Sequence, residues 1–166
     1  MKIALFGHKI QEKQLPFYRQ LLLEIQSYSC EIMIFERLFE SLRGHLPGLN
    51  NASSFSETDE LSGGVDYIFS VGGDGTFLDS IRFAYRMGIP ILGFNTGRLG
   101  FLSSISTDNI SPALKALHDG DFVVEQRSLL SLQTRAQLYC PHNYALNEIC
   151  IHKKDSASMI SIQAWV

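Results

Sequence analysis

The sequence lacks the features that mark several large classes of protein. Its 166 residues contain no apolar run near the roughly 18 residues of a membrane-spanning helix. The start Met1-Lys2-Ile3 does not resemble a secretory signal peptide. Fourteen Lys and Arg residues against seventeen Asp and Glu residues give a net charge of −3, without blocks of like charge. We therefore expect no membrane contact, no nucleic-acid partner and a cytoplasmic location.

Cysteine is also scarce. The three cysteines are an odd number in a chain without a secretion signal, which argues against a disulfide framework. Free thiols are the simpler interpretation, but Cys140, His142, Cys150 and His152 together offer side chains that zinc accepts. Their spacing matches none of the usual zinc patterns, so a zinc site at these residues stands only as an alternative.

The sequence does contain a regular alternation of apolar runs and helical periodicities. Apolar runs predict buried strands at residues 2–8, 30–35, 65–71 and 89–94. Apolar residues at helical spacing predict helices at residues 17–29, 36–46, 77–88 and 111–120. The polar, glycine-containing segment 47–64 is expected to be a surface loop. This order predicts an α/β domain over residues 1–121, with a doubly wound and mostly parallel sheet.

The pattern changes after Asp121. Four segments look extended, with no convincing helix between them: residues 122–125, 129–135, 145–152 and 159–166. They predict the start of a β-rich second domain over residues 122–166. Alternate apolar residues of the last segment would share one face with no later element to cover them, so we expect a truncated chain.

One motif points to chemistry. Gly72-Gly73-Asp74-Gly75-Thr76 follows the strongest predicted strand and precedes a helix, where open α/β sheets bind ligands. Glycines let backbone N–H groups approach a phosphate, and an Asp among them would accept a proton or hold a cation. The simpler interpretation is an ordinary Asp-Gly turn. The chain has neither the usual phosphate loop nor the Gly-x-Gly-x-x-Gly fingerprint, so a nucleotide site must be built differently.

Three segments carry a resemblance to a known family. Gly72–Thr76 is similar to a signature shared by NAD kinases, diacylglycerol-type lipid kinases and phosphofructokinases. The segment Gly93–Leu102 resembles the second motif of NAD kinases and differs from that of lipid kinases. Ala145-Leu146-Asn147-Glu148 resembles their Asn-Glu segment, and Glu125–Leu130 before it is also similar. The chain thus resembles the first half or more of an NAD kinase.

The resemblance implies an activity and a set of site residues. The activity is phosphoryl transfer from ATP to the 2′-hydroxyl of the adenosine ribose of NAD, with a divalent cation, Mg²⁺ above all. Asp74 is then the proton acceptor, and Asn147 and Glu148 hold the adenosine portion of NAD in a substrate-binding second domain. The other implied nucleotide-binding residues are Gly72, Gly73, Gly75, Thr76, Asn95 and Ser158. A homodimer or homotetramer is implied, and the 166-residue chain alone is expected to be inactive.

Other interpretations of these residues stay open. The protein could be a diacylglycerol-type lipid kinase or a non-catalytic dinucleotide-binding module. Asn147 and Glu148 could be polar residues at a solvated strand edge. His8, directly after the first predicted strand, could lie near the site or be a hydrogen-bonded structural histidine.

Overall fold

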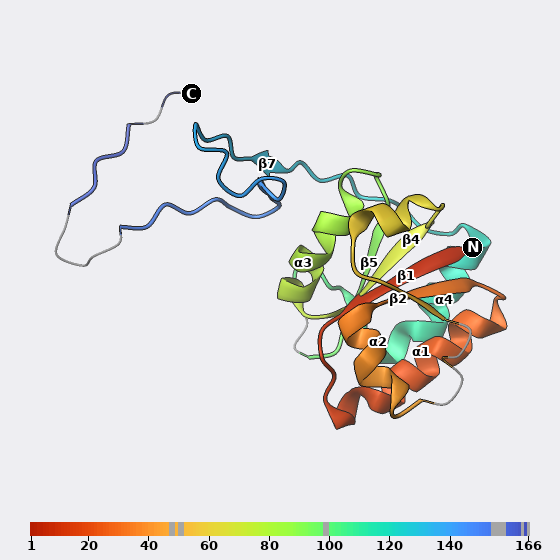
Figure 1. Cartoon of the computed structure of the whole chain (residues 1–166). Helices are drawn as coiled ribbons and strands as arrows, with labels where there is room; N and C mark the ends of the chain where they lie inside the picture. The colour runs from red at the N-terminus through yellow and green to blue at the C-terminus, as the bar shows by residue number, and fades with distance from the viewer. Residues whose placement is uncertain (47–48, 50–51, 98–99, 154–158, 164, 166) are drawn as a thin grey trace. The chain divides into compact units, whose positions relative to one another are not determined.

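Six segments of the chain pair into one parallel sheet (Figure 1). The computed structural model describes residues 1–46, 49, 52–97, 100–153, 159–163 and 165. The strands are β1 (Lys2–Gly7), β2 (Glu31–Phe35), β3 (Ser53–Phe55), β4 (Tyr67–Gly72), β5 (Ile91–Asn95) and β6 (Ile105–Ser106). Their order is β3-β2-β1-β4-β5-β6, and every neighbouring pair is parallel. The chain builds outward from β1 in one direction and then from β4 in the other, so the order reverses between these two strands.

Helices cover both faces of this sheet. They are α1 (Leu15–Ser27), α2 (Glu36–Arg43), α3 (Asp74–Ala84) and α4 (Ile110–Asp119), with short 3₁₀ turns η1 (Glu12–Gln14), η3 (Thr58–Ser62) and η4 (Thr107–Asn109). Figure 1 shows α1, α2 and α4 on one face and α3 on the other. The predicted α/β class with a doubly wound parallel sheet is confirmed.

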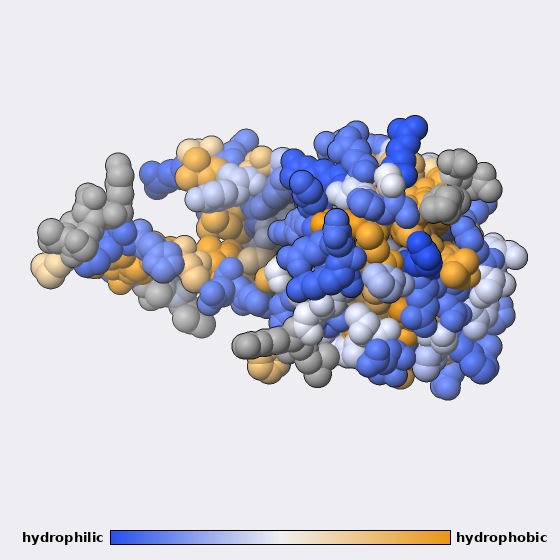
Figure 2. All heavy atoms as spheres, turned by 90° about the horizontal axis from the view of Figure 1, so that it is seen from below, coloured by the Kyte–Doolittle hydropathy of each residue, from blue (hydrophilic) through white to orange (hydrophobic). Residues whose placement is uncertain are grey.

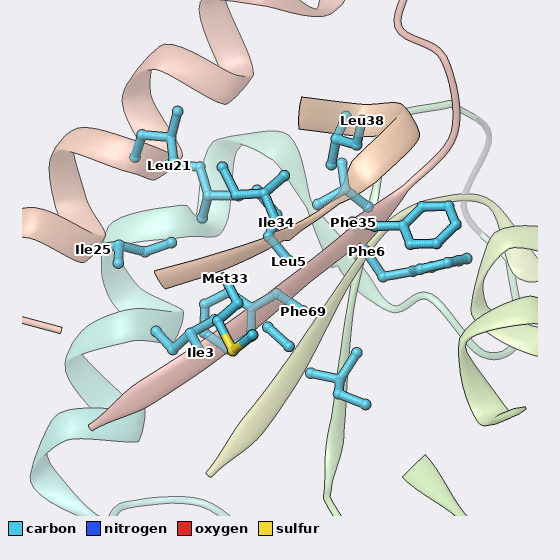
Figure 3. Close-up of a cluster of buried hydrophobic side chains, with 14 of the residues drawn as sticks. Ile3, Leu5, Phe6, Leu21, Ile25, Met33, Ile34, Phe35, Leu38 and Phe69 are labelled. Atoms are coloured by element: carbon cyan, nitrogen blue, oxygen red, sulfur yellow. The ribbon is translucent and has the colours of Figure 1, made fainter. Parts of the chain in front are cut away.

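The core forms because alternate residues of each strand face opposite layers. In β1, Leu5 lies on the side of α1, where Leu21 and Ile25 pack over it (Figure 3). Phe6 points to the side of α3, where its ring centroid is 5.4 Å from that of Phe83. All five side chains are at most 1% exposed, so both helix layers exclude water from the sheet.

An aromatic cluster joins α3 to three strands. Phe83 of α3 lies 5.4, 5.6 and 5.3 Å from the rings of Phe6, Phe35 and Phe55, which belong to β1, β2 and β3. These are distances at which tilted aromatic pairs attract one another beyond simple burial. The cluster therefore fixes the position of α3 against the carboxyl-terminal halves of β1 and β2.

The structure corrects the predicted secondary structure at two places in the first domain. The expected loop 47–64 contains strand β3 and turn η3, and strand β6 was not predicted at all. Both strands are short and only partly apolar, so no local hydrophobic pattern marks them. β3 exists because its backbone pairs with β2, in the register Phe35↔Phe55, and β6 because it pairs with β5.

The chain divides into two units, Met1–Val124 and Glu125–Val166. Among the described residues of the second unit, β7 (Leu130–Ser131) pairs in antiparallel fashion with β8 (Tyr144–Ala145). The strands predicted at 122–125 and 145–152 are wrong apart from Ala145, and the described residues of 159–166 contain no strand. Apolar side chains such as Ile151 and Trp165 are 68% and 82% exposed, and Figure 2 shows apolar atoms open to solvent. An apolar pattern becomes a stable sheet only where further strands or helices cover it.

Within the described residues, no helix combines the length and the apolar composition needed to cross a bilayer.

Candidate functional site

The carboxyl ends of β1, β4 and β5 form one edge beside the point where the strand order reverses. Gly7 pairs in register with Val71, and Val71 pairs with Phe94. One residue further along, His8, Gly72 and Asn95 therefore follow at the same level across the three strands. Loops after strands at such a reversal are the usual ligand-binding position in open α/β sheets.

The predicted glycine motif connects β4 to α3. Gly72 ends the strand with a φ of 159°, and a Cβ there would lie 2.2 Å from the Thr76 hydroxyl oxygen. Glycine at this position thus lets the Thr76 side chain fold back over the strand end. A Cβ at Gly73 or Gly75 would meet no atom within 4 Å. The packing of the chain itself does not require these two glycines, and their backbone is open to an approaching ligand.

Asp74 is the first residue of α3, and its carboxylate binds the loop that follows β5. Oδ2 accepts a hydrogen bond from the Phe101 N–H at 2.9 Å. Oδ1 accepts bonds from the N–H groups of Leu102 and Ser103 at 3.0 and 3.1 Å. These three bonds, that from Ser103 foremost, lower the pKa of Asp74 below its ordinary value. A carboxylate has about four acceptor positions, so roughly one remains for another donor.

Gly100 makes this arrangement possible. A Cβ on residue 100 would lie 2.2 Å from Oδ1 of Asp74 and 2.7 Å from Oδ2, far inside van der Waals contact. Only a residue without a side chain lets the loop bring three consecutive N–H groups onto one carboxylate. Such a convergence of N–H groups is a common way of binding an anion, and here the anion belongs to the protein.

Asn95 holds the start of the same loop. Its side chain is buried, with Nδ2 donating to the Ser103 carbonyl at 3.3 Å and Oδ1 accepting from the Gly97 N–H at 2.8 Å. The Thr96 hydroxyl accepts a bond from Gln14 of η1 at 2.9 Å, which ties the loop to the segment after β1. The loop after β5 is thus fastened at both ends. Residues 98 and 99 between them lie outside the described residues.

The amino-acid sequence matches the family described as the ATP-NAD kinase N-terminal domain over residues 4–122. The chain belongs to this family. The resemblance predicted from three motifs is thereby confirmed, and a lipid kinase is not favoured.

The relatives of this ATP-NAD kinase family member align with the whole chain, whereas the chain spans only a little over half of their own length. The NAD kinase of Christiangramia forsetii is 34% identical over 168 residues, and that of Bacteroides fragilis is 37% identical over 166 residues. Both matches cover 100% of this chain and 57% of the relative. A crystal structure of yeast NADH kinase complexed with NADH has a TM-score of 0.66 at 16% identity, covering 81% of this chain and 44% of that one. The similarity to the yeast structure shows a shared fold.

The other predicted site residues of the ATP-NAD kinase chain belong to the second unit. Asn147 and Glu148 follow β8 closely, outside any regular strand, and both are exposed. A hydrogen bond with the Glu148 carboxylate raises the pKa of the Cys150 thiol. Ser158 lies outside the described residues. The structure thus brings together Gly72–Thr76 and Asn95 in the first unit.

Metal ligands are not gathered in the part of the chain that the structure describes. No three His, Cys, Asp or Glu side chains there lie close enough to hold an ion. The search covers the four residues of the zinc alternative, which form no such group: Cys140, His142, Cys150 and His152. Around Asp74, three backbone N–H groups donate to the carboxylate and occupy most of its acceptor positions. These neighbours are hydrogen-bond donors and not further metal ligands.

Two features of this edge were missed by sequence reasoning. One is the bond network from Asp74 to residues 101–103, which are 27 to 29 positions away. The other is the bond between His8 Nε2 and Asp79 Oδ2, 2.9 Å long and 71 positions apart. The order of the strands creates both, and no local sequence pattern signals them. For His8, the hydrogen-bonded interpretation agrees with this contact.

Proposed function

We propose that this protein transfers a phosphoryl group from ATP to the 2′-hydroxyl of the adenosine ribose of NAD, producing NADP. Membership of the ATP-NAD kinase family supports the reaction class. The observation that carries the proposal is the Asp74 carboxylate, placed at the start of α3 between two open glycines, with its pKa lowered by hydrogen bonds from the N–H groups of the loop after β5. A carboxylate in that position can orient a hydroxyl nucleophile beside phosphates that approach the glycine backbone.

In this proposal Asp74 is the proton acceptor. Its lowered pKa makes it a weak base, but phosphoryl transfer depends more on position and charge than on base strength. The three bonds from the loop fix its direction, and its remaining acceptor position takes the ribose hydroxyl. The open backbone at Gly73 and Gly75 would approach the phosphates, with Gly72 and Thr76 shaping the turn. Asn95 acts by holding the loop that bonds to Asp74.

The second unit would supply the adenosine contacts. We propose that residues 122–166 begin a β-rich substrate-binding domain in which Glu148 accepts bonds from ribose hydroxyls and Asn147 binds nearby, with Ser158 as a further contact. The exposure of Asn147 and Glu148 supports this role, because both are accessible to a ligand.

Further properties follow from the family. A divalent cation, Mg²⁺ above all, would arrive with the ATP phosphates as part of the substrate, since Mg²⁺ commonly binds through substrate phosphates. The N–H groups around Asp74 cannot serve as ligands for this cation, so no step of the reaction is assigned to an ion held by the protein. A cytoplasmic homodimer or homotetramer is proposed on the family resemblance.

The test uses the protein at its full natural length. NADP formation from NAD and ATP should be observed, and Asp74→Asn should lower kcat by roughly a hundredfold or more while the fold stays intact. Diacylglycerol in place of NAD is the control for a lipid kinase. Tight binding of NAD without NADP formation would instead support a non-catalytic module. Near-normal turnover by Asp74→Asn would remove Asp74 from the mechanism.

A further inference from the structure

The imidazole of His8 is held at the strand edge by a carboxylate on α3. His8 follows β1 at the level of Gly72, and its ring lies 5.7 Å from that of Phe6. Both side chains lie on the face that α3 covers, because residues two apart in a strand share a face. Asp79 of α3 binds Nε2 of His8 through Oδ2 at 2.9 Å. The glycine turn that begins α3 and the His8–Asp79 pair therefore lie on the same side of the sheet.

This pair is open to solvent. The side chains of His8 and Asp79 are 51% and 58% exposed. Exposed ion pairs contribute little to stability, so packing does not explain the arrangement. Within the described residues, the imidazole of His8 is hydrogen-bonded to Asp79 through Nε2. A carboxylate on Nε2 orients the ring, and Nδ1 is the nitrogen available to a ligand.

A cationic side chain, that of Arg82, lies one helical turn beyond Asp79. The guanidinium carbon of Arg82 is 4.5 Å from the ring centroid of Phe83 and 5.8 Å from that of Phe35. Phe35 is the last residue of β2 and packs 4.9 Å from Phe6, the neighbour of His8 on the same face. Arg82 forms no ion pair with a carboxylate in the described part of the chain. Its guanidinium is thus held beside Phe35 at the end of β2, without an ion-pair partner among the described residues.

We propose that His8 and Arg82 bind the polyphosphate chain of the phosphoryl donor, with Asp79 as the residue that positions His8. The proposal rests on the proposed kinase function and specifies where the donor phosphates lie. The open backbone at Gly73 and Gly75 leads into α3, the helix that carries both Asp79 and Arg82. Asp79 bonds to His8 at the end of β1, and Arg82 lies beside Phe35 at the end of β2. Backbone N–H groups at a helix start and cationic side chains together are the groups that recognise a polyphosphate.

The proposal separates donor binding from chemistry on the acceptor. Asp74 faces the loop after β5, whereas His8 and Arg82 face the ends of β1 and β2. Losing His8 or Arg82 should therefore weaken binding of ATP and leave binding of NAD nearly unchanged. Asp79 bears a negative charge, so its contribution is orientation of the imidazole rather than direct attraction of phosphate.

The experiment measures direct binding by calorimetry to the protein at its full natural length. Probes are ATP, inorganic tripolyphosphate, adenosine and NAD. His8→Gln and Arg82→Gln should each weaken ATP and tripolyphosphate about tenfold, the usual scale for losing one charge-assisted bond. Adenosine and NAD should be nearly unaffected. Arg86→Gln is the matched control, because Arg86 is also an exposed arginine over an aromatic ring, but it follows the end of α3 and its Nε donates a hydrogen bond to the Tyr85 hydroxyl at 2.9 Å.

Asp79→Asn tests the positioning role. It should weaken tripolyphosphate about threefold in the wild-type background and have no further effect in the His8→Gln background, since it acts through the imidazole. An equal loss in both backgrounds would overturn that role.

Several results would overturn the main proposal. They are unchanged tripolyphosphate affinity in both His8→Gln and Arg82→Gln, an equal loss in Arg86→Gln, no binding of ATP by the wild type, or a fall in kcat without a fall in affinity. The last would make His8 a proton carrier instead. If the wild type makes no NADP but shows the His8-dependent tripolyphosphate binding, the proposed kinase function fails, whereas the assignment of His8 and Arg82 as a polyphosphate site stands.

Discussion

The contact between Gly100 and Asp74 allows a sharp test of the site. In Gly100→Ala, the new methyl group would lie 2.2 Å from Oδ1 and 2.5 Å from Cγ of Asp74. An ordinary van der Waals contact begins at 3.4 Å, so the loop and the carboxylate must separate by about 1 Å. The three nearest atoms all belong to the short Asp74 side chain, whose carboxylate is held by three N–H groups and therefore has little freedom to yield.

The size of the effect follows from this displacement. A misplacement of about 1 Å at a reacting group costs on the order of a hundredfold in rate, and we expect kcat to fall by about that factor. The fold should survive, because the loop residue Phe101 is exposed and the aromatic cluster under α3 is not involved. The melting temperature is expected to change by only a few degrees.

The pH profile adds an independent measurement. Bonds from Ser103, Phe101 and Leu102 lower the pKa of Asp74 in the folded protein, so its charged form persists to lower pH than in the unfolded chain. The stability that these bonds contribute is present above the unfolded pKa and is lost as pH falls through the folded pKa. In Gly100→Ala the bonds lengthen, the pKa of Asp74 rises, and the acid limb of kcat/KM moves to higher pH.

The matched control is Gly97→Ala in the same loop. Its new methyl group would lie 3.8 Å from the nearest atom, Oδ1 of Asn95, which is an ordinary contact. Near-wild-type kcat and an unshifted acid limb are expected. If Gly100→Ala and Gly97→Ala have the same kcat and the same pH profile, the loop does not position Asp74 and the reasoning is wrong.

Three further predictions concern other parts of the protein. Gly75→Ala places its methyl group in open space, so stability should hold or rise slightly while ATP affinity falls about tenfold; unchanged affinity would show that no ligand approaches this backbone. Glu148→Gln should weaken NAD about tenfold to a hundredfold and ATP much less, and equal losses for both would indicate a general defect. Phe83→Ala removes a ring that is 1% exposed and contacts three other rings, so urea unfolding should show a loss of about 3–5 kcal/mol, and a loss below about 1 kcal/mol would contradict the packing.

Much of the first domain could be predicted because burial leaves a local record in the sequence. The apolar run at Ile3–Phe6 becomes the central strand β1, and the helical spacing of Leu21 and Ile25 becomes the buried face of α1. Strand β3 has no such apolar pattern in the sequence, because Ser53 and Ser54 are exposed and only Phe55 is buried. Extended segments in the second unit were overpredicted for the opposite reason: alternating apolar residues occur there without a covering layer.

The sequence by itself determined the alternation of strands and helices, the glycine motif after a buried strand, and the family. These depend on short-range periodicity and on residue types at fixed spacing. Only the tertiary structure decided which loops are neighbours, because parallel pairing of β1 with β4 and β4 with β5 sets that order. It therefore also decided that Asp74 bonds to residues 101–103 and that His8 bonds to Asp79, since hydrogen-bond partners far apart in the chain meet only after the sheet has formed.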